Sequence, residues 1–189
     1  DIYLLATPKT HVRDFHLVSE FKGDNYQSAT FKVDAFVKNL GDKATSGKTL
    51  DVTLLDPSGK TVSTLSQKID VVENYKEKVF KLETKVENPL LWSAEKPNLS
   101  SVILSLKNEK GEEMEAMSSK FGFRKIEIKN KRFYINNEPV LFKGTNRLDI
   151  DPQTGKEVPV DTMFTDVLMR KQHNLNMVTT SNYQTTNKR

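Results

Sequence analysis

Alternation of apolar and polar residues dominates the first two thirds of the chain. The longest run extends from Tyr26 to Leu40, and its odd-numbered positions from 29 to 37 are all apolar. A period of two places successive side chains on opposite faces of a strand, so this run predicts a β-strand with one buried face. Shorter runs that also predict strands are Val12–Phe21, Thr49–Leu55, Val62–Val72, Lys76–Leu82, Ser101–Leu106 and Glu113–Phe123.

These runs give about seven strands before residue 125, separated by turn signals such as Asp56-Pro57-Ser58-Gly59, and helical periodicity is absent there. Strands with one apolar face are buried by packing two antiparallel sheets together, so we expect an immunoglobulin-like β-sandwich. The candidates for its core, or for packing at the end of the sandwich, are Phe31, Phe36, Phe80, Leu82, Trp92, Leu104 and Phe121.

The pattern changes after Phe123. A hairpin is followed by an apolar strand, a polar loop, an amphipathic segment and another strand, which is the order of one β/α unit of a parallel sheet. Asp161 is expected to cap the helix, because its carboxylate can accept from free backbone N–H groups. The predicted segments are the hairpin 125–135, the strand Val140–Lys143, the loop 144–160, the helix Thr162–His173 and the strand Leu175–Thr180.

Composition narrows the class of protein. The 29 Lys and Arg residues are spread along the chain and the net charge is only +4, so no nucleic-acid partner is expected. The absence of Cys excludes disulfides, a thiolate nucleophile and Cys-bound metal. No apolar run reaches the roughly 20 residues of a membrane helix, so we expect no membrane partner and a soluble protein of the cytoplasm or periplasm. His11, His16 and His173 are scattered, so no metal site is expected.

Four segments of the chain stand out: NPLLWSAEKPNL (88–99), FGFRKIEI (121–128), INNEPVLFKGTNRLDIDPQTGK (135–156) and DTMFTDVLMRKQHNLNMVTTSNY (161–183). Together they resemble the glycoside hydrolase family 2 enzymes, bacterial β-galactosidases most closely. The resemblance implies an immunoglobulin-like sandwich at 1–125 and the N-terminal portion of a TIM barrel at 126–189. The fold class expected is therefore mainly β, a sandwich followed by an incomplete (β/α) barrel segment, in which the hairpin closes the barrel bottom.

The resemblance also implies what chemistry the chain lacks. Retaining glycosidases use two carboxylates, and in this family both come from barrel strands beyond Arg189. We expect no catalytic residue, cofactor or metal here and no hydrolysis by this chain alone. The first residue is Asp1 rather than Met, so the chain is expected to be processed or cut from a longer protein. Asp149 and Asp151 are close in sequence but lie in a polar loop, where a structural or solvated role is expected.

Two loops resemble the sugar-binding loops of the family. After the first barrel strand, Asn146, Arg147 and Asp149 match the family pattern, but Leu148 stands where His is usual. After the second strand, Asn182 replaces another His. The implied ligand is a β-galactoside, with substrate-binding candidates Asn146, Arg147, Asp149 and Asn182. Two explanations of these replacements stay open. The parent protein is a degenerate, inactive or altered-specificity relative of the family, or the replacements reflect an untypical subgroup or sequence errors.

Several alternatives stay open. The chain is part of a β-galactosidase-like hydrolase, with β-glucuronidase and β-mannosidase as enzymatic alternatives, or a non-catalytic module that spaces domains or mediates subunit contact. Trp92 is expected either to pin a long loop or to stack on a sugar. Arg147 is expected either to pair with a carboxylate of the next strand or to face the substrate. Two strands and one helix cannot close a barrel, so the chain from about residue 145 is expected to be partly disordered, packed on the sandwich, or buried in a homo-oligomer.

Overall fold

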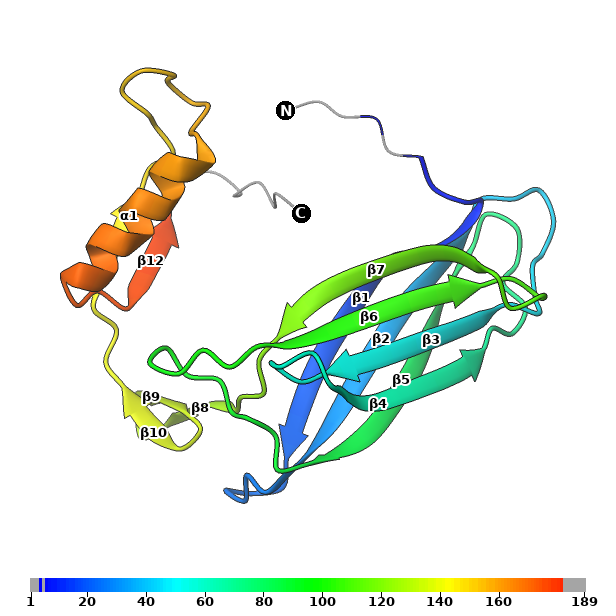
Figure 1. Cartoon of the computed structure of the whole chain (residues 1–189), viewed down its shortest axis with the longest axis horizontal. Coiled ribbons are helices and arrows are strands. Elements are labelled where there is room, and N and C mark those ends of the chain that lie inside the picture. The colour runs from blue at the N-terminus through cyan, green and yellow to red at the C-terminus, as the bar shows by residue number, and fades with distance from the viewer. Residues whose placement is uncertain (1–3, 5, 182–189) are drawn as a thin grey trace. The chain divides into compact units, whose positions relative to one another are not determined.

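The computed structural model describes Leu4 and residues 6–181 (Figure 1). The chain divides into two compact units, Asp1–Glu138 and Pro139–Arg189, which we call the first and the second unit. The first unit is built from strands, and the second contains the one helix of the described residues. Within the described part of the chain, no helix has the length and apolar character needed to cross a membrane.

Seven antiparallel strands of the first unit form two sheets, which Figure 1 shows one in front of the other. Each sheet presents one face to the other, and the predicted sandwich is confirmed. The first sheet has the order β1-β2-β5, with β1 (Thr10–Phe21), β2 (Ser28–Asn39) and β5 (Glu77–Glu87). The second has the order β4-β3-β6-β7, with β3 (Thr49–Leu55), β4 (Thr61–Lys68), β6 (Ser100–Lys107) and β7 (Glu113–Phe121).

The core lies between these sheets and follows the predicted alternation. Along β2, every odd-numbered residue from Ala29 to Val37 is buried, and Phe31 is 0% exposed. Across the core, β3 and β6 contribute Leu50, Val52 and Leu104, all nearly inaccessible to water. Burial of these apolar side chains is the main favourable term in folding the sandwich.

One of the predicted core residues has a different place. Phe36 is only half-buried on the outer face of the first sheet, where the Arg13 guanidinium lies 5.5 Å from its ring centre. The prediction was wrong because Phe36 is five positions from Phe31, and an odd spacing places a side chain on the opposite face of a strand. Trp92 is half-buried in the long loop between β5 and β6, and its contact with Phe123 fits the alternative of packing at the end of the sandwich.

A small sheet of order β10-β9-β8 follows the sandwich. Its strands are β8 (Ile126–Lys129), β9 (Arg132–Ile135) and β10 (Glu138–Val140). Asn130 and Lys131 connect β8 to β9 with φ values of 48° and 62°. Positive φ at both central residues is typical of a two-residue type I′ hairpin, so the predicted hairpin is confirmed.

The second unit contains β11 (Gly144–Arg147), α1 (Val160–Gln172) and β12 (Met177–Thr180), and β11 pairs with β12 in parallel. The β/α unit is confirmed, but its first strand is not the predicted Val140–Lys143. That strand was expected because the run is apolar, whereas pairing with β12 makes the more polar Gly144–Arg147 extended. The helix begins after Pro159, and no side chain caps it. Asp161 instead lies in the first turn, where its negative charge interacts favourably with the positive end of the helix dipole.

Candidate functional site

The ends of β11 and β12 bring the two predicted sugar-binding loops together. The strands run in register, with Asn146 opposite Thr179 and Arg147 opposite Thr180. The Ser181 amide then donates to the Arg147 carbonyl at 2.9 Å. Parallel strands have their carboxyl ends at the same edge of a sheet, so the loop after β11 and the segment after β12 start side by side. Asn182 lies outside the described residues.

Asn176 fixes the register of this strand pair. Its amide N–H donates to the Lys143 carbonyl at 3.0 Å, and its side-chain oxygen accepts from the Lys143 N–H at 2.8 Å. Its side-chain nitrogen donates to the Leu141 carbonyl at 3.0 Å. Asn176 was not among the predicted site residues, although an amide inside the predicted strand Leu175–Thr180 was the available signal.

Arg147 is held by two carboxylates. Its side chain is 11% exposed, its Nε donates to Asp166 Oδ2 at 2.9 Å, and its Nη1 pairs with Asp149 Oδ1. Asp166 belongs to α1, and Asp149 belongs to the loop after β11. Pairing of Arg147 with carboxylates therefore occurs, but the expected partner on the next strand was wrong, because Thr180 lies opposite Arg147 on β12.

Leu148 and Ile150 are the apolar members of the loop that follows β11. They are 47% and 55% exposed, and the Ile150 amide donates to the Leu148 carbonyl at 2.9 Å. An aliphatic side chain can neither donate nor accept a hydrogen bond. Position 148 therefore offers apolar surface rather than a polar contact to a sugar hydroxyl.

Asp151 organises the rest of this loop. Its Oδ1 accepts from the backbone N–H groups of Gln153 and Thr154 at 2.8 and 3.0 Å, and Thr162 of α1 donates to Oδ2 at 3.3 Å. Two backbone hydrogen bonds also join Asp151 to Gly155. The pKa of Asp151 lies below its ordinary value, chiefly because the Thr154 N–H donates to its carboxylate. The hydrogen bond from the Gln153 N–H is the second cause. These contacts support the structural role expected for Asp151.

Trp92 is pinned from several sides. Its amide donates to the Phe123 carbonyl at 2.9 Å, and the Asn136 side chain donates to its carbonyl at 3.0 Å. The Arg124 guanidinium lies 4.5 Å from the ring centre, which is close enough for a cation–π contact. A side chain at Gly122 would meet Trp92 at 2.8 Å. The pinned-loop interpretation is supported, because Arg124 occupies a face on which a sugar would stack.

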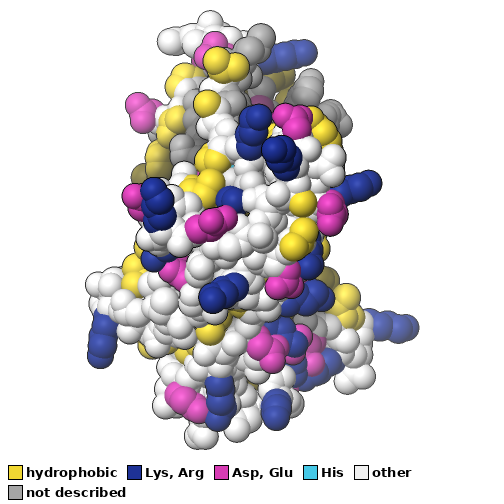
Figure 2. All heavy atoms as spheres, turned by 90° about the vertical axis from the view of Figure 1, so that its right-hand side faces the viewer, with side chains coloured by type: hydrophobic (Ala, Val, Ile, Leu, Met, Phe, Trp, Pro, Cys, Tyr) yellow, Lys and Arg dark blue, Asp and Glu magenta, His cyan; other side chains and the backbone are white. Residues whose placement is uncertain are grey.

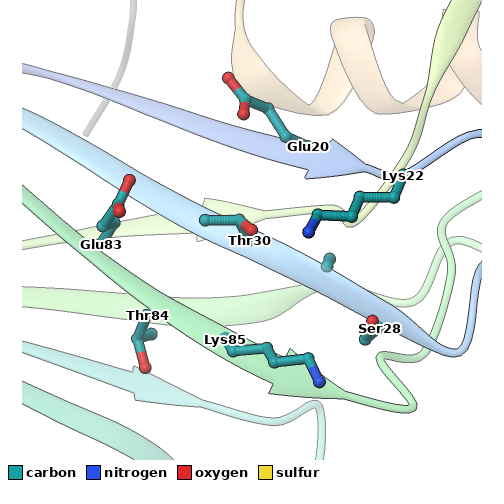
Figure 3. A pocket seen from close by; sticks show the side chains of 8 residues that line it. Glu20, Lys22, Ser28, Thr30, Glu83, Thr84 and Lys85 are labelled. Atoms are coloured by element: carbon teal, nitrogen blue, oxygen red, sulfur yellow. The ribbon is translucent and has the colours of Figure 1, made fainter.

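The outer face of the first sheet carries a hollow of about 370 Å³ at one end of β1, β2 and β5 (Figure 3). Its lining includes Glu20, Glu83, Lys22 and Lys85, so charges of both signs meet there. On the side of the molecule that Figure 2 shows, Lys and Arg side chains are also interspersed with Asp and Glu. Among the described residues, no group of His, Asp and Glu side chains could hold a metal ion.

Comparison with known proteins gives the same lineage along the whole chain. The model for glycosyl hydrolases family 2 matches residues 10–124, and the TIM barrel domain model of that family matches residues 126–188. The chain is similar to the β-galactosidase of Priestia megaterium, with 36% identity over 97% of this chain and 18% of that protein. The β-galactosidase of Clostridium acetobutylicum is 32% identical over 97% of this chain and 19% of its own length.

Solved structures show the same fold. The Bacteroides uniformis β-glucuronidase matches with a TM-score of 0.83 and 22% identity, over 96% of this chain and 22% of that chain. A family 2 glycosyl hydrolase of Bacteroides cellulosilyticus matches with a TM-score of 0.84 and 17% identity, over 94% of this chain and 24% of that chain. This chain thus spans less than a fifth of the two curated relatives and about a quarter or less of these structures. Because the family model matches residues 10–124, the chain belongs to glycosyl hydrolases family 2.

Proposed function

We propose that the chain is the sandwich and the start of the barrel of a β-galactosidase-like hydrolase that acts on terminal β-galactosides. The observation that carries this proposal is the 36% identity to a β-galactosidase over 97% of the chain. The sandwich would occupy 1–125 and the barrel segment 126–189, which agrees with the ranges of the two family models. The β11–α1–β12 unit would supply the first two strands of the barrel.

The carboxylates of the second unit described above favour a chain without catalytic acids. A retaining glycosidase needs two carboxylates about 5–5.5 Å apart, and the proton donor needs a raised pKa. Asp149 and Asp166 pair with Arg147, and Asp151 has a lowered pKa because backbone N–H groups stabilise its anion. We therefore place the acid and the nucleophile on later barrel strands, and this chemistry requires no metal or cofactor.

The sugar-facing residue that the geometry favours is Asn146. It is exposed at the end of β11, and its amide can donate to and accept from hydroxyl groups. Arg147 and Asp149 would support the same loop by pairing with each other, and Asn182 would contribute from the segment after β12. Because two carboxylates offset the charge of Arg147, this region favours a neutral galactoside over a sugar acid.

Isothermal titration of the chain with galactose, lactose and glucuronate tests the binding role. We expect weak binding of galactose and lactose, weaker or no binding of glucuronate, and loss of binding on Asn146→Ala. Gln67→Ala, an amide removed from β4 of the first unit, is the control that should leave binding unchanged. Preference for glucuronate, or full retention of binding in Asn146→Ala, would contradict the assignment.

The second candidate is a non-catalytic module that spaces domains or mediates subunit contact. It is favoured by the sandwich, which has its own closed core and an outer face of mixed, paired charges. Absence of binding to all three sugars would favour this role.

The helix α1 has no buried residue, and Phe164, Val167 and Leu168 are more than half exposed. We propose that the remaining barrel covers them, with a homo-oligomer as the alternative.

A further inference from the structure

We propose that Asp166 of α1 is a positioning residue that, through Arg147, holds the loop after β11 in place. The description of this loop as sugar-facing rests on the proposed function, whereas the network itself rests only on contacts within the second unit. Asp166 lies on α1, a helix without buried residues, 19 positions along the chain from Arg147.

Asp166 accepts a hydrogen bond from Arg147 and forms an ion pair with Arg170. Arg147 Nε donates to its Oδ2 at 2.9 Å, and Arg170 Nη1 lies 3.9 Å from the same oxygen. Arg170 also donates from Nε to Thr145 Oγ1 at 3.1 Å. One carboxylate on the helix is therefore tied to two positions of β11, directly at Arg147 and through Arg170 at Thr145.

The spacing of these positions on the strand explains the arrangement. Thr145 and Arg147 are two residues apart, so both side chains point to the face of β11 that α1 covers. Asn146 lies between them and its side chain points to the opposite face. Arg147 thus acts on the helix side of the strand pair, while Asn146 is left free for a ligand on the other side.

The pairing of Arg147 extends this tie into the loop. Its Nη1 pairs with Asp149, so that Arg147 joins a carboxylate of the helix to a carboxylate of the loop. The side chains of Arg147 and Arg170 are only 11% and 18% exposed. Without the charge of Asp166, Arg147 would keep its pair with Asp149, and Arg170 would lose its ion pair with Asp166. The mutual repulsion of the two guanidinium groups and the lost hydrogen bond would then displace Arg147 and release the loop.

Nuclear magnetic resonance of the whole 189-residue chain tests the proposal in Asp166→Asn. We expect the Arg147 Nε–H to exchange with water about tenfold faster, as follows from loss of a hydrogen bond to a charged group. We also expect the backbone order parameters of residues 148–150 to fall from about 0.85 to below about 0.6. Asp161→Asn is the matched control, because it removes the same charge from the same helix at an exposed position and should leave both signals unchanged.

Two further variants separate positioning from general stability. Asp166→Glu retains the charge and should keep the loop ordered, even where Asp166→Asn unfolds the unit. In an Arg147→Met background, Asp166→Asn should add no further loss of order at 148–150. An ordered loop in Asp166→Asn, a disordered loop in Asp166→Glu, or an undiminished effect in the Arg147→Met background would each overturn the proposal. None of these measurements uses a sugar, so their outcome does not depend on whether the chain binds one.

Discussion

Replacement of Phe31 by alanine tests the assignment of the sandwich core. Phe31 is 0% exposed, and its ring lies 5.2 Å from that of Phe121 and 6.1 Å from that of Phe123. Deletion of a buried Phe side chain typically costs about 3–5 kcal/mol of unfolding free energy. The two ring contacts add about 0.5–1.5 kcal/mol each to burial alone, so the upper part of that range is expected.

Phe36→Ala is the matched control, because it makes the same change on the other face of the same strand. Phe36 is half-buried, and the Arg13 guanidinium lies 5.5 Å from its ring centre. Loss of a partly exposed cation–π contact and of partial burial should cost about 1 kcal/mol. The structure therefore predicts a difference of about 3 kcal/mol between two Phe→Ala changes on one strand.

Urea unfolding followed by the fluorescence of Trp92, the single tryptophan, measures this difference. Slopes of about 1–3 kcal/mol per molar urea convert the predicted gap into midpoints that differ by about 1–3 M. Equal midpoints for the two variants, or a larger loss in Phe36→Ala, would refute the register of β2 and the position of the core.

Two other predictions concern the Trp92 loop and the Asp151 turn. Gly122→Ala should destabilise the first unit by about 1–3 kcal/mol and shift the Trp92 emission, because the new methyl group would lie 2.8 Å from Trp92; an unchanged urea midpoint and spectrum would contradict the close packing. The pKa of Asp151 is lower in the folded chain than in the unfolded chain, so its contribution to stability is present above the unfolded value and is lost as the pH falls through the folded value. Urea unfolding between pH 2.5 and 7 should thus show a loss of stability below about pH 4 that is smaller in Asp151→Asn, and identical pH profiles would count against it.

Much of the sandwich could be predicted from the sequence because its strands have one wet and one dry face. The odd-numbered residues of β2 are apolar and buried, so periodicity alone gave both the strand and its inner face. Phe36 shows the limit of this reasoning, since its apolar character suggested the core while its position placed it on the outer face. The hairpin between β8 and β9 was likewise predicted, although Asn130 and Lys131 are not the most typical turn pair.

The second unit was harder to predict because non-local contacts determine its details. The polar strand Gly144–Arg147 is extended because β12 and Asn176, some 30 residues later, pair with it. The partners of Arg147 depend on which face of β11 the helix covers, and sequence spacing does not show this. Asn146 and Arg147 lie at the end of the strand as expected. Only the structure shows that Arg147 faces α1 and that Asn146 points to the opposite face of β11.

The hydrolysis of a nitrophenyl β-galactoside most directly tests the central claim, that this chain provides framework and a sugar-facing loop but no catalytic carboxylates. Purified chain should release no more nitrophenol than a preparation from cells that carry the empty vector. Under the proposed function, a complete hydrolase that includes this chain should release nitrophenol, and mutation of the carboxylates proposed on later barrel strands should abolish the release. Turnover by the 189-residue chain above the vector background would contradict the account.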